Sequence, residues 1–105
     1  MTRRSLRGIK SAMPRFLIEV PHEAETIACA KVVKVFLASG SHLLTHADWG
    51  CRDGDHKAWM IVDVANKDEA MAIVPPAFRS VARIVGLNYF SLDQIDEILK
   101  THRSA

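Results

Sequence analysis

Histidines, tryptophans and carboxylates concentrate between Ser41 and Asn66, in the stretch SHLLTHADWGCRDGDHKAWMIVDVAN. His46 with Asp63 is the pair whose types suit proton transfer, because an imidazole titrates near neutral pH and a carboxylate can orient it. We expect these two as the catalytic residues if the protein is an enzyme. The residues expected to contact a ligand beside them are Glu19, His42, Trp59 and Arg83.

The same stretch contains metal-ligating side chains. His42, His46, Cys51 and His56 lie within fifteen positions, and zinc or nickel accepts imidazole and thiolate ligands. The spacing argues against a shared ion, because residues four apart on a strand are roughly 13 Å apart. We therefore assign no metal ligand and no cofactor, and keep a metal-binding protein that uses His and Cys of residues 42–56 as an alternative.

Cys51 is also a candidate reactive thiol. Arg52 and His56 nearby favour the thiolate, whereas Asp53 and Asp55 oppose it. No partner for a catalytic dyad is recognisable, so we interpret Cys51 as an incidental loop thiol.

Composition limits the class of protein. The chain has 105 residues, 49% of them hydrophobic, which is enough for one domain with a single core. A net charge of +2 is too small to predict nucleic-acid binding, and no apolar run approaches the roughly 20 residues of a membrane span. The two cysteines, Cys29 and Cys51, do not form a disulfide framework, so we expect a reduced, cytoplasmic protein.

Residues 1–12 contain four basic side chains and no acidic one. We interpret them as a disordered extension ahead of one domain spanning 13–105, because termini without apolar anchors are usually loose. A basic arm for nucleic acid or anionic surfaces, or a targeting peptide, are the alternatives.

Two kinds of periodicity predict the elements that position these residues. Alternation and β-branched or aromatic content predict strands at 15–20, 42–49, 57–65 and 80–85, with Asp53-Gly54 as the turn between the middle two. Helical spacing predicts helices at about 23–38, from the N-cap Asn66 to the Pro75-Pro76 pair, and from Ser91 to about 100.

The strand patterns predict a sheet with one covered and one bare face. The covered face takes Phe16, Ile18, Val20, Met60, Val62 and Val64, and the bare face takes Leu17, Glu19, Leu44, Trp59 and Ile61. A bare face with tryptophan, leucine and isoleucine suits a monomer poorly, so we expect a homodimer that pairs two sheets face to face.

The order strand-helix-strand-strand-helix-strand with a final helix resembles the ferredoxin-like fold. It is similar in particular to the dimeric α+β barrel superfamily of small proteins, over about residues 13–102. This resemblance implies an α+β fold and is compatible with a small-molecule pocket on the open sheet face, used by an isomerase or a cofactor-free oxygenase. It transfers no residue role. A regulatory or interaction module without catalysis remains the alternative, and enzyme and binder stay equally open.

Overall fold

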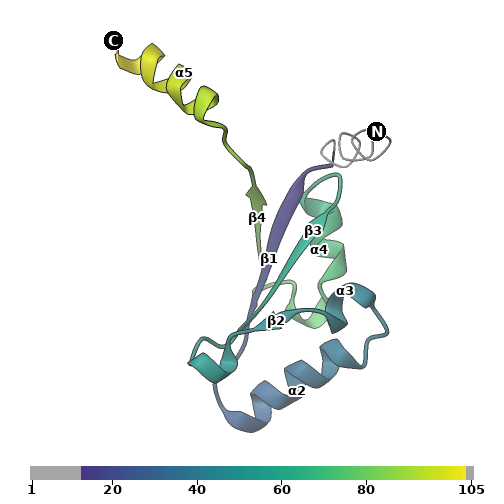
Figure 1. Ribbon diagram of the computed structural model, residues 1–105. Coiled ribbons are helices and arrows are strands. Elements are labelled where there is room, and N and C mark those ends of the chain that lie inside the picture. Colours follow the sequence, from purple (N-terminus) through teal and green to yellow (C-terminus); the bar gives the residue numbers. More distant parts are fainter. Residues whose placement is uncertain (1–12, 104–105) are drawn as a thin grey trace, which may run out of the picture.

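The structure, a computed structural model, describes residues 13–103 (Figure 1). The expected basic extension at 1–12 lies outside these residues. The elements follow in the order β1 (Arg15–Pro21), α2 (Thr26–Leu37), α3 (His42–Thr45), β2 (Asp48–Trp49), η1 (Cys51–Asp53), β3 (Lys57–Asp63), α4 (Lys67–Ile73), η2 (Pro76–Phe78), β4 (Arg83–Leu87) and α5 (Leu92–Arg103). None of the helices in this part of the chain is long and apolar enough to cross a lipid bilayer.

The strands form one antiparallel sheet in the order β2-β3-β1-β4, so the protein is a small α+β domain. β1 is central and pairs with β3 on one side and β4 on the other, and Leu17 faces Ile61 and Val85 across the two ladders. Since side chains alternate along a strand, this register also places Ile18 beside Met60 and Ile84 on the opposite face.

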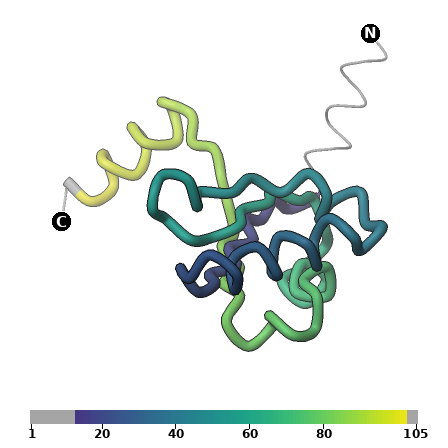
Figure 2. Tube along the Cα trace, turned by 90° about the horizontal axis from the view of Figure 1, so that it is seen from below, coloured from purple at the N-terminus to yellow at the C-terminus, as the bar shows by residue number. Residues whose placement is uncertain are grey.

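The core lies between that opposite face and the helices. α2 contributes Phe36 and α4 contributes Ala70 to the same buried cluster, so both helices cover one face of the sheet, as Figure 2 shows. The predicted covered face is confirmed, with the correction that Val64 follows β3 and is only partly buried. The buried side chains are Phe16, Ile18, Val20, Phe36, Leu44, Ala58, Met60, Val62, Ala70 and Val74.

Side-chain caps fix where the helices begin. Glu25 accepts hydrogen bonds from the backbone amides of Ile27 and Ala28 at the start of α2. Asn66 accepts from the Glu69 amide at the start of α4, and Ser91 and Gln94 form a reciprocal capping pair ahead of α5. The predicted N-caps of the last two helices are therefore confirmed.

The predicted strand at 42–49 is wrong over most of its length. His42 to Thr45 form the helical turn α3, and only Asp48–Trp49 pair with β3. The Ser41 side chain accepts a hydrogen bond from the Leu44 amide at 3.2 Å, which starts the turn locally. Leu44 is consequently 4% exposed in the core and does not lie on the bare face.

The last strand also differs from its prediction. It begins at Arg83, later than predicted, because the amides of Val81 and Ala82 bond to the Phe78 carbonyl and hold a turn there. After β4 the chain runs past the end of the sheet, and α5 extends away from the rest of the domain in both views (Figures 1 and 2).

Candidate metal centre

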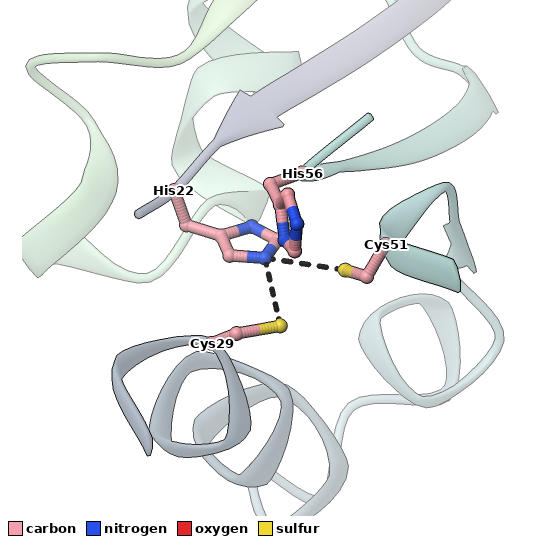
Figure 3. Close-up of side chains that lie close together, drawn as sticks. All are labelled: His22, Cys29, Cys51 and His56. Atoms are coloured by element: carbon pink, nitrogen blue, oxygen red, sulfur yellow. Dashed lines mark hydrogen bonds between the residues drawn. The ribbon is translucent and has the colours of Figure 1, made fainter. Parts of the chain in front are cut away.

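Four metal-ligating side chains converge at one end of the sheet. They are His22, Cys29, Cys51 and His56, and their donor atoms all lie within 4.8 Å of one another. Figure 3 shows the two thiols and the two imidazoles pointing toward a common centre from separate parts of the chain. All four residues are partly buried.

The ladder between β1 and β3 brings the two histidines together. His22 directly follows β1 and His56 directly precedes β3. The His22 amide donates a hydrogen bond to the His56 carbonyl at 3.0 Å, which extends the antiparallel pairing by one step. Residues opposite each other in such a ladder have neighbouring side chains, and the two imidazole centroids are 5.6 Å apart.

The two cysteines arrive from the helix layer and from the loop after β2. Cys29 lies in the first turn of α2, which the Glu25 cap holds in place. Cys51 opens η1, directly after Gly50. A Cβ at Gly50 would lie 2.7 Å from the Asp55 carbonyl oxygen and from the Trp59 ring, so only glycine lets the loop fold this tightly.

The two distances from His22 to the sulfurs suit a shared ion better than a pair of hydrogen bonds. His22 Nε2 lies 3.3 Å from both Cys29 Sγ and Cys51 Sγ. One ring nitrogen offers either one proton or one lone pair, so it cannot make two full hydrogen bonds with these sulfurs. A zinc ion with bonds of about 2.0–2.3 Å separates its sulfur and nitrogen donors by roughly 3.3–3.8 Å.

The electrostatics of the pocket favour neutral imidazole. Burial, and then the neighbouring His56, lower the pKa of His22 below its ordinary value. Burial, and then the adjacent Cys29, raise the pKa of Cys51 above its ordinary value. Without a cation the cluster therefore holds an imidazole ready to ligate and a protonated thiol, and binding of a cation releases the thiol proton.

Two buried nitrogens in this cluster have no hydrogen-bond partner of good geometry within residues 13–103. They are Nδ1 of His22 and Nδ1 of His56. Buried polar atoms are nearly always satisfied in folded proteins, and an exception requires an explanation such as an ion or a water. An ion bound at Nε2 of His22 would not reach Nδ1 of the same ring, so it could account directly only for the His56 nitrogen.

The cluster is accessible from the surface. A cleft of about 480 Å³ beside the cysteines is lined by Cys29, Val33, Ala47, Asp48, Trp49, Cys51 and Arg52. Both sulfurs therefore border an entry path for an ion.

Three residues predicted from the sequence meet on the other face of the sheet. His42, His46 and Trp59 line a hollow of about 350 Å³ together with Leu17, Leu43, Asp48, Met60 and Ile61. Because residues 42–45 are helical, the rings of His42 and His46 lie next to each other, tilted by 48°, with centroids 4.4 Å apart. His46 Nδ1 lies 2.8 Å from the His42 carbonyl oxygen, which leaves Nε2 as its basic nitrogen.

The remaining predicted residues lie on this open face but outside the lining of the hollow. Glu19 accepts a hydrogen bond from Trp59 Nε1 at 3.0 Å. Arg83 faces Glu19 across the β1–β4 ladder, and Asp63 faces Arg15 at the far end of β3. The structure therefore groups His46 with His42 and Trp59, and leaves the predicted partner Asp63 two positions beyond Ile61.

The alternative metal site, predicted for His and Cys of residues 42–56, shares two residues with this cluster. Cys51 and His56 belong to it, whereas His42 and His46 lie in the hollow on the other face. The sequence analysis missed His22 and Cys29. A sequence pattern that could have identified them is a histidine directly after the strand end at Pro21. The second part of the pattern is a cysteine in the first turn of the helix that follows.

Comparisons of the chain with protein-family models, with curated proteins and with solved structures find no match.

Proposed function

We propose that this protein binds one zinc ion through His22, Cys29, Cys51 and His56. The observation that carries the proposal is the convergence of two thiols and two imidazoles, with one imidazole nitrogen 3.3 Å from both sulfurs. Two sulfur and two nitrogen donors in a tetrahedral arrangement are the preferred set of zinc. Two thiolates also neutralise the dication, which suits a half-buried site.

The ion has a structural role in this proposal. Structural zinc sites use four protein ligands, whereas catalytic sites use three and keep a position for water or substrate. Here four ligands come from the end of β1, the first turn of α2, the start of η1 and the residue before β3. Zinc thus joins the sheet, the helix layer and the loop in a binding or regulatory module.

The arrangement of the elements supports a ferredoxin-like fold as the finer assignment. The two strand-helix-strand halves interleave, which gives the order β2-β3-β1-β4, and α2 and α4 pack on one face. The metal cluster is then at the end of the sheet where β1 finishes and α2 follows, away from the open face.

Zinc content and cysteine variants test the proposed site. The chain is produced without a histidine tag, exposed to zinc, desalted and analysed for metal. We expect about one zinc per chain. Cys29→Ser and Cys51→Ser each lower zinc affinity by more than 100-fold, since changes to mere outer-sphere partners of a metal already cost about 10–100-fold. Cobalt(II) in place of zinc gives a thiolate charge-transfer absorption that is weaker in each variant, because each retains only one of the two thiolates.

His42→Asn and His46→Asn are the matched controls, because these histidines are exposed and lie outside the cluster. Both retain the zinc content of the unchanged chain. Failure of the unchanged chain to retain zinc would refute the site, and so would an equal loss in the control variants.

A second function, binding of a small molecule on the open face, is favoured by the hollow that contains His42, His46 and Trp59. A cavity with apolar walls and a few convergent polar groups is the usual form of a ligand site. Its apolar walls come from Leu17, Leu43, Met60 and Ile61. Nε2 of His46 is the group in this hollow that could accept a proton from a hydroxyl.

Phenol is a suitable probe for this hollow, because it offers a ring to Trp59 and a hydroxyl to His46. In ¹H–¹⁵N spectra titrated with phenol, we expect shifts confined to α3 and the middle of β3, and a weaker response for His46→Ala. Shifts spread evenly over the surface, or none up to millimolar phenol, would contradict a binding site there.

A further inference from the structure

The C-terminal segment exposes an unusual share of the large apolar side chains in residues 13–103. Tyr89 and Phe90 are 79% and 67% exposed, and Leu92 and Leu99 are 75% and 59% exposed. Ile98 is also exposed, and Ile95 is half-buried. These side chains lie on an arm that extends away from the domain (Figures 1 and 2).

α5 has one apolar side. At 100° per residue, its apolar stripe is formed by Leu92, Ile95, Ile98 and Leu99. An isolated helix of about 12–15 residues or fewer is only marginally stable in water, so packing of such a stripe must supply most of its stability. The arm therefore needs a surface against which this stripe can pack.

The structure holds the arm away from its own sheet. The Arg15 side chain donates a hydrogen bond to the Tyr89 hydroxyl at 2.6 Å, and its guanidinium lies 4.2 Å from the centre of the Tyr89 ring. Arg15 is the first residue of β1 and faces Leu87, the last residue of β4. This contact directs the chain outward past the end of the sheet.

The open face of the sheet has an apolar row between two charged rows, which contain Arg15 with Asp63 and Glu19 with Arg83. Leu17 forms a row with Ile61 on β3 and Val85 on β4, and Leu87 lies one step further along the same face. Ile61 is 61% exposed. Among residues 13–103, the helices α2 and α4 pack on the other face of the sheet. The short helix α3 borders the row only at the hollow that it shares with Leu17 and Ile61.

We propose that α5 of a second copy docks on this open sheet face, and that the exchange is reciprocal in a two-fold symmetric dimer. The apolar side of α5 in each copy then covers the apolar row on the sheet of the other copy. Both apolar surfaces are buried, and the symmetric dimer exposes no further site of the same kind. From the sequence alone, direct pairing of two sheets is the expectation. Because α5 extends outward, α5 of a second copy can bury the open sheet face and its own apolar side together, which direct pairing of two sheets would not do.

The exposed area is adequate for such a dimer. Aromatic side chains bury about 150–250 Å² each, and a stable interface buries about 800 Å² on each partner. Tyr89, Phe90 and the three exposed aliphatic residues of α5, together with the sheet row they meet, supply apolar area of this order. The hollow beside Trp59 borders the same row, so the partner helix also bounds it.

The oligomeric state of matched variants tests the exchange. Light scattering coupled to gel filtration, at fixed zinc, should show the full chain as a dimer. Leu99→Glu places a charge on the apolar side of α5, and Ile61→Glu places a charge in the apolar row of the sheet. Each variant raises the dimer dissociation constant at least tenfold. Ile27→Glu is the control, since Ile27 is equally exposed at 59% but lies on α2; it leaves the dimer intact.

Mixing the two variants distinguishes exchange from other dimers. A mixed dimer combines the intact helix of Ile61→Glu with the intact sheet of Leu99→Glu, so the mixture dimerises more strongly than either variant alone. A chain ending at Ser91 is expected to be a monomer. A monomeric full chain, or a dimer that survives this truncation, would overturn the proposal, and the second result would favour direct pairing of the sheets.

Discussion

Removal of zinc by a chelator should lower the melting temperature of the protein by roughly 15–30 °C. A ligand present at a thousand times its dissociation constant stabilises the native state by about 4 kcal/mol. One kcal/mol moves the melting temperature of a domain of this size by about 4–8 °C. The measurement is circular dichroism melting of zinc-loaded and chelator-treated protein, followed by readdition of zinc.

A double variant, Cys29→Ser with Cys51→Ser, controls for effects of the chelator itself. It should melt at the same temperature with and without zinc, close to the metal-free unchanged chain. The melting temperature of the unchanged chain should also rise with the logarithm of free zinc. If zinc-loaded and chelated protein melted together, the ion would have no structural role.

Phe36→Ala should destabilise the domain by about 3–5 kcal/mol, the usual cost of truncating a buried aromatic side chain. Phe36 is 0% exposed. Its ring packs edge-on against Trp49 at 5.0 Å and beside Phe78 at 6.0 Å. Because α2 carries Cys29 and Trp49 precedes the Cys51 loop, zinc affinity should fall as well. Urea unfolding, with and without zinc, measures both effects.

Leu37→Ala is the matched control on the same helix, because Leu37 is 55% exposed. Surface substitutions usually change stability by no more than about 0.5 kcal/mol. Equal losses for Phe36→Ala and Leu37→Ala would show that α2 does not pack through Phe36 in solution.

Alternation along single strands was enough to predict much of the sheet. Phe16, Ile18 and Val20 recur every second residue, and so do Met60 and Val62, which identified β1, β3 and their covered faces. The capping pairs at Asn66 and Ser91 were readable because their partners lie only three residues away. Both kinds of signal are local.

The segment after Gly40 was misread because its signal is ambiguous. Leu43 and Leu44 fit a short strand as well as one turn of helix. The helical conformation is favoured by Ser41, which caps the turn, and by the burial of Leu44 in the core. With the turn helical, the rings of His42 and His46 are in contact, whereas a strand would have separated them.

The metal cluster could not be assembled from spacing along the chain. His22 meets His56 only in one register of the β1–β3 ladder, and Cys29 joins them only once α2 lies over that end of the sheet. Cys51 and His56 are close in sequence and were recognised as ligand types. Predicting the whole cluster would have required the β1–β3 register and the position of α2, which are tertiary information.

The four donors have a consequence for synthesis of the chain. The last of them is His56, near the midpoint of the 105 residues. A ribosome therefore completes the ligand set before it has made α4, β4 or α5. Zinc captured at that stage would tie β1 to the start of β3 while the nascent chain is still growing, and so set the pairing on which the later elements assemble.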